Sequence, residues 1–144
     1  EQAPRLKALL DHVREALANG DESERREALT ALRRKADAIA DAPDTIRAGV
    51  VDPGFAEQSR PWLEAMQLWG RALNLTADGL DAADRGNPAA TRYFADARRI
   101  AAQAAAVQSI PGAVRFDGPI KIADGVLDTF IADAPGLIAV TARP

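Results

Sequence analysis

Three aspartates, Asp78, Asp81 and Asp84, form the densest group of side chains that could do chemistry in this sequence. Their spacing places them along one edge of a helix, where carboxylate oxygens could hold a cation such as calcium. A soluble, charged helix end gives the same pattern and is the favoured interpretation. A second pair, Asp124 and Asp128, is typical of a helix cap followed by an exposed face. Two carboxylates can hydrolyse a glycoside, but the outside of a helix offers no cleft that would raise the pKa of one of them.

The usual parts of a nucleophilic active site are missing from the sequence. A serine nucleophile needs a base beside it, and the single histidine, His12, flanks an apolar stripe with Leu9 and Val13, where we expect it to be partly exposed. The absence of cysteine excludes a thiolate nucleophile, a thiolate zinc site, an iron–sulfur cluster and a disulfide scaffold. The sequence also lacks the spacings of carboxylate di-metal sites, EF-hands and phosphate-binding loops. We therefore expect no catalytic residue, no metal and no cofactor in this chain.

Two tryptophans, Trp62 and Trp69, are the most informative side chains. They lie seven residues apart, so on a helix they share one side at a separation of two turns. Each ring buries a large area, which favours packing in the core or against a neighbouring domain. The alternative is that one ring contributes to a sugar-stacking edge. We predict that Trp62 and Trp69 are packing or interface residues.

The elements that position these residues are helices. Pro61 stands where a helix can begin, and the apolar side chains after it recur every three or four residues as far as Leu80. This pattern predicts one long central helix over residues 61–85, about 37 Å in length at 1.5 Å per residue. The same periodicity predicts four more helices, over residues 4–19, 21–42, 88–107 and 124–136.

The segments between these helices contain proline and glycine. Residues 43–59 hold two of each, which predicts only short helical turns near 44–48 and 54–58. Residues 112–123 alternate apolar and polar side chains around Pro119, which indicates a short irregular or extended arm. The sequence thus predicts an all-α bundle of about five helices in a single domain, residues 1–136, followed by an exit linker, residues 137–144.

Composition and charge exclude several classes of protein. Of the 144 residues, 47% are apolar, 5% are aromatic and 27% are charged, and the net charge is −3. The apolar fraction is too high for a disordered chain, and no apolar run approaches the roughly 18 residues of a membrane span. A mildly acidic chain with interspersed charges is a poor nucleic-acid binder. We expect neither a nucleic acid nor a membrane as a partner, and we expect the chain, which starts at Glu1, to be a piece of a longer protein.

One segment resembles a known family. Residues 60–73 read RPWLEAMQLWGRAL, which is similar to the P-W-L…W-G-x-A-L helix that follows the catalytic barrel in hyaluronidase-type β-N-acetylglucosaminidases. This glycoside hydrolase family also contains the protein O-GlcNAcases. Residues 46–49 and 126–130 agree with the same pattern, so the resemblance spans most of residues 43–134.

The resemblance implies a non-catalytic helical module of a multidomain, secreted bacterial glycoside hydrolase. Catalysis in that family uses the substrate's 2-acetamido group and two adjacent aspartates of the barrel, and this chain has no Asp-Asp dipeptide. The implied partners are the catalytic barrel of the same parent chain and its N-acetylglucosaminide glycan. The module would pack on the barrel and frame either the substrate groove or a protein interface. Only Trp62 and Trp69 carry over, as packing residues. A stand-alone extracytoplasmic bundle that binds a ligand or a protein is the alternative.

Overall fold

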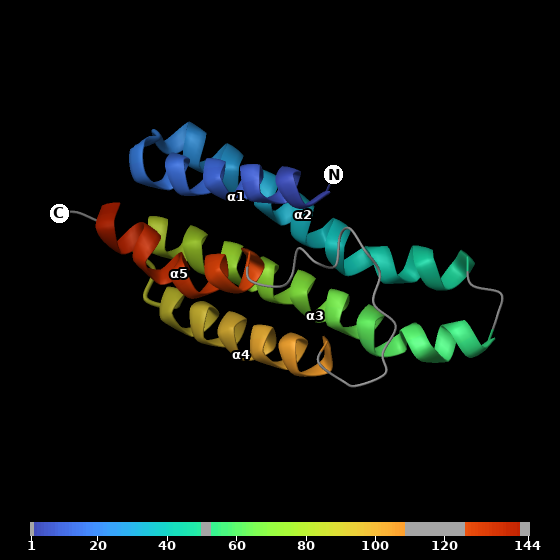
Figure 1. Ribbon diagram of the computed structural model, residues 1–144. Helices are drawn as coiled ribbons and strands as arrows, with labels where there is room; N and C mark the ends of the chain where they lie inside the picture. The colour runs from blue at the N-terminus through green and yellow to red at the C-terminus, as the bar shows by residue number, and fades with distance from the viewer. Residues whose placement is uncertain (1, 50–52, 109–125, 142–144) are drawn as a thin grey trace.

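The computed structural model describes residues 2–49, 53–108 and 126–141 of the chain. Within these residues it contains helices and no strands (Figure 1). The helices are α1 (Gln2–Asn19), α2 (Glu22–Gly49), α3 (Pro53–Asp84), α4 (Ala90–Gln108) and α5 (Val126–Thr141). The predicted all-α bundle with one long helix is thereby confirmed. None of the described helices combines the length and the apolar character that a membrane crossing requires.

Helix α3 is the centre of the bundle. It packs against α2, α4 and α5, whereas α1 packs against α2 and α5 (Figure 1). The other helices are linked by contacts in the order α2, α1, α5 and α4. Helices α2 and α4, the first and last of this order, share no comparable interface in the described part of the chain. One side of α3 is thus not covered by any of the described helices.

The core follows the apolar periodicity of the sequence. Trp69, Leu73 and Leu80 of α3 are almost fully buried, together with Phe130 of α5. Opposite them, α4 contributes small buried side chains such as Ala97, and these allow its backbone to come close to α3. The predicted apolar seam of the long helix is therefore the face that packs in the core.

Two glycines of α3 allow close contact with neighbouring helices. A Cβ atom added to Gly70 would lie 2.6 Å from both the Cβ and the backbone nitrogen of Ala40 in α2. A Cβ atom added to Gly79 would lie 2.6 Å from the ring of Phe94 in α4. Real Cβ atoms do not approach other atoms this closely, so Gly70 leaves room for the backbone of α2, and at Gly79 the Phe94 ring would have to shift.

Polar caps define two of the helix ends. At the start of α2, the Asp21 carboxylate accepts a hydrogen bond from the backbone N–H of Glu24 at 2.8 Å, and the Glu24 carboxylate accepts one from the N–H of Asp21 at 2.9 Å. This reciprocal capping box fixes the start of α2 next to Asp21, as predicted for the helix over residues 21–42. At the end of α3, Gly86 has a φ of 71°, and the next N–H donates to the carbonyl of Ala82 at 2.8 Å. This left-handed glycine stops the helix.

The predicted break over residues 43–59 is wrong. Helix α2 continues to Gly49 instead of ending near Ala42, and α3 begins at Pro53, so that Pro61 lies inside it. A proline inside a helix removes one backbone hydrogen bond and disturbs the preceding turn. The loss of this one hydrogen bond does not end α3, because the residues on both sides of Pro61 remain helical.

The predicted end of the last helix is also wrong. Helix α5 passes through Pro135 and Gly136 and continues to Thr141, so residues 137–141 are helical and do not form a linker. Leu137 packs against the core, which gives the continued helix a tertiary contact. The predicted arm at residues 112–123 lies outside the described residues, as do residues 142–144.

Candidate functional site

The aspartates of α3 that sequence analysis considered as a cation site pair with arginines of α2. The Arg25 Nε donates to the Asp84 carboxylate at 2.7 Å, and Arg33 donates to Asp78. The second guanidinium nitrogen of Arg33 lies 4.0 Å from Asp81. We call these five residues the arginine–aspartate seam. Because each carboxylate already faces a guanidinium, a cation would have to displace an arginine, and no group of metal-ligating side chains occurs among the described residues.

Farther along the same two helices, the side chains between α2 and α3 become shorter and carry fewer charges. The Asn74 amide donates to the Asp37 carboxylate at 2.8 Å, which is the next polar link between α3 and α2. One turn beyond it, Gly70 lies against Ala36 and Ala40. The two helices are therefore held together first by ion pairs, then by one hydrogen bond, and then by direct backbone contact.

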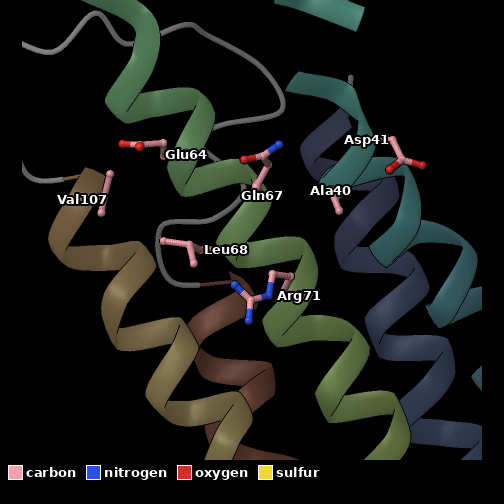
Figure 2. Close-up of a pocket in the computed structure, with 7 residues that line it drawn as sticks. All are labelled: Ala40, Asp41, Glu64, Gln67, Leu68, Arg71 and Val107. Atoms are coloured by element: carbon pink, nitrogen blue, oxygen red, sulfur yellow. The ribbon is translucent and has the colours of Figure 1, made fainter. Parts of the chain in front are cut away.

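A groove opens beyond this contact, along the uncovered side of α3 (Figure 2). It has a volume of about 480 Å³, within the range of small-molecule sites. Helix α3 supplies its floor, α2 supplies one wall and α4 the other. We call it the α3 groove, and its lining residues are Ala40, Asp41, Glu64, Gln67, Leu68, Arg71 and Val107.

The floor of the groove has charged ends and an apolar centre. Glu64 and Arg71 lie seven residues apart on α3, and Leu68 lies between them, on the side of α4 where Val107 projects (Figure 2). Glu64, Arg71 and Asp41 are exposed, and none of them forms an ion pair with another described residue. Among the described residues, the groove therefore presents two exposed carboxylates and one exposed guanidinium without an ion-pair partner.

The two predicted tryptophans lie on the helix that forms the groove floor. Trp69 is 3% exposed and belongs to the main core cluster, so its ring packs inside the bundle. Trp62 is in α3, but its side chain is outside the described residues. Next to it, Leu63 and Met66 form a small second cluster with Ile39 of α2.

Two of the remaining candidates of the sequence analysis, His12 and Asp128, are not among the lining residues of the α3 groove. His12 is exposed on α1, and Asp128 is exposed on α5. Asp124 is outside the described residues.

Sequence reasoning did not single out the polar floor of the groove. Glu64, Gln67 and Arg71 lie within the segment that carries the family resemblance, but only its tryptophans were considered as site residues. The spacing of three, four and seven residues from Glu64 to Gln67, Leu68 and Arg71 was a usable signal, because it places all four on one helical stripe opposite the apolar seam. What the spacing could not reveal is that, in the part of the chain that the structure describes, no neighbouring helix covers this stripe.

The groove can form ion pairs and hydrogen bonds around a short apolar patch. The glutamine amide both donates and accepts, the arginine donates through a planar fork, and the carboxylates accept. These groups suit recognition of a partner, because Glu64, Arg71 and Asp41 are exposed and offer donors and acceptors at the surface. Comparisons of the chain with protein-family models, with curated proteins and with solved structures gave no match.

Proposed function

We propose that this chain is a non-catalytic helical module of a bacterial, secreted glycoside hydrolase of the β-N-acetylglucosaminidase or hyaluronidase type. In this proposal the module packs on the catalytic barrel of its parent chain, which supplies the two adjacent aspartates and binds the glycan. The resemblance of residues 60–73 to the helix that follows the barrel in that family is the starting point.

One structural observation supports the proposal most. The segment that carries the resemblance forms the middle of α3, where Trp69 and Leu73 fill the core while Glu64 and Arg71 line the groove on the other side. A segment that serves both the core and an open polar surface is what a docking module requires. By contrast, the carboxylates with the best spacing for chemistry are engaged with arginines of α2.

Activity measurements test this proposal. We expect the purified chain to leave an aryl N-acetylglucosaminide unhydrolysed. We also expect that a protein encoding the barrel and this bundle together hydrolyses it and melts at a higher temperature than the barrel alone. Turnover by these 144 residues alone would overturn the proposal. So would flanking gene sequence that encodes no β/α barrel with paired aspartates.

A second candidate function is a stand-alone extracytoplasmic bundle that binds a small ligand. The volume of the α3 groove, about 480 Å³, favours it, since pockets for small molecules start near 300 Å³. Titration with chitin or hyaluronan oligosaccharides, followed by amide NMR shifts around Arg71, would distinguish the two. Saturable shifts that Arg71→Ala abolishes and Arg34→Ala retains would support the ligand-binding bundle, whereas a flat titration would favour the docking module.

A further inference from the structure

The α3 groove has the outline of a site for a helix. Its floor residues Glu64, Gln67, Leu68 and Arg71 form a stripe over two turns of α3, and the walls come from Ala40 of α2 and Val107 of α4. Elsewhere around α3 the neighbouring position is filled by α2, α4 or α5. The groove is therefore the one side of α3, among the described residues, on which no helix of the chain packs.

The charges of the floor are arranged so that a helix could match them. Glu64 and Arg71 are separated by about 10 Å along the axis, from seven residues at 1.5 Å each. Leu68, between them, is only half-buried and lies beside Val107. A helix placed across this stripe would meet a carboxylate at one end, an apolar centre, and a guanidinium at the other end.

We propose that the α3 groove is the docking site of one amphipathic helix of a partner protein or module. The helix lies antiparallel to α3, because neighbouring helix dipoles then oppose one another. It carries a carboxylate against Arg71, an apolar side chain on Leu68 and, seven residues after the carboxylate, a cation against Glu64. The inference depends only on the groove, and it holds whether or not the parent protein is a glycosidase.

Two helical peptides of equal composition test the proposal on the full chain. The first carries a glutamate and, seven residues later, a lysine, with leucines between them on the same face. The second has the glutamate and the lysine exchanged. We expect the glutamate-first peptide to bind about tenfold more tightly in calorimetry, since two exposed ion pairs become two repulsions of similar size in the other peptide.

A charge-swapped variant makes the test specific to the groove. In the double variant Glu64→Lys with Arg71→Glu, we expect the preference to reverse in favour of the lysine-first peptide. Both residues are exposed, so the variant should keep its helical circular dichroism and its melting temperature. The matched control is Glu22→Lys with Arg26→Glu, which swaps an exposed pair on α2 outside the groove and should leave the preference unchanged.

Three results would overturn the proposal. One is the binding of neither peptide, and another is a preference that the double variant does not reverse. The third is self-association of the wild-type chain that Glu64→Lys abolishes in light scattering, since this would assign the groove to a second copy. Failure of the glycosidase proposal is recognised separately, by the activity and gene-sequence tests, because the peptide measurement involves neither a barrel nor a glycan.

Discussion

Helices α2 and α3 contact each other in two regions that differ in how their charges are used. In the arginine–aspartate seam, near the start of α2 and the end of α3, each carboxylate of Asp78, Asp81 and Asp84 faces an arginine of α2. At the other end of the helix pair, Asp41, Glu64 and Arg71 surround the α3 groove without an ion pair to another described residue. The seam joins two helices of the bundle, whereas the charges around the groove are exposed and make no ion pair with another described residue.

The boundary between the two regions is a close helix contact. At Gly70 the backbones of α2 and α3 come together, so no side chains of useful length fit between them. On the seam side of this contact the helices face each other with long polar side chains. On the groove side, Leu63 and Met66 of α3 pack against Ile39 of α2, while Glu64 and Arg71 are exposed. A difference in packing thus accompanies the difference in charge pairing.

Replacing Trp69 by alanine should lower the stability of the protein most, because it removes the apolar side chain that supports the groove floor. Trp69 is 3% exposed in the main core cluster. We expect Trp69→Ala to lower the free energy of unfolding by about 3–5 kcal/mol, the usual cost of an aromatic cavity. Urea denaturation would measure this. A loss below about 1 kcal/mol would mean that the groove floor is not held by the core.

The close contact at Gly70 can be tested with one methyl group. Gly70→Ala should lower the free energy of unfolding by about 1–2 kcal/mol, because overpacking against backbone atoms of α2 outweighs the better helix propensity of alanine. Gly136→Ala is the matched control, since a Cβ atom there meets nothing within 4 Å. It should raise the free energy of unfolding by up to about 1 kcal/mol. If Gly70→Ala were equally stabilising, the two helices would not be in close contact.

The seam should respond to salt. Arg33→Ala removes the partner of Asp78, and both side chains are more than one-third exposed, so we expect a loss of about 0.5–1 kcal/mol at low ionic strength. Raising the salt concentration should shrink the difference between this variant and the wild type, because salt screens exposed ion pairs. Arg71→Ala, which removes an arginine without an ion pair to another described residue, should change the stability by less than about 0.5 kcal/mol at any salt concentration.

The smallest expected effect concerns an exposed pair outside both regions. The hydrogen bond from Lys7 holds the pKa of Asp11 below its ordinary value, and the charges of Lys7 and Arg14 act in the same direction. The stabilisation from this ionised carboxylate is present above the unfolded-state pKa, near 3.8, and is lost as the pH falls through the lower folded-state pKa. In an NMR titration, Lys7→Ala should raise the pKa of Asp11. An unchanged pKa would show that the pair does not form in solution.

The amino-acid sequence was sufficient to predict the helices and the core face of α3, since apolar residues every three or four positions mark one buried stripe. It failed at Pro61 and Pro135, because a proline signals the loss of one hydrogen bond and not the end of a helix. It could not pair Arg33 with Asp78, which are 45 residues apart in the chain and are brought together only by packing. The sequence could not predict the groove either, because an exposed stripe of α3 forms a groove only when α2 and α4 pack on either side of it.

The unfolding free energies of two matched variants on α3, Asp78→Lys and Glu64→Lys, test the central claim most directly. Both change a carboxylate to an ammonium on the same helix, one in the seam and one in the groove. We predict a loss of about 1–2 kcal/mol for Asp78→Lys, which places a cation against Arg33, and a change within about 0.5 kcal/mol for Glu64→Lys. Equal losses for the two variants would contradict the claim that the seam uses its charges for the fold while the groove leaves them free for a partner.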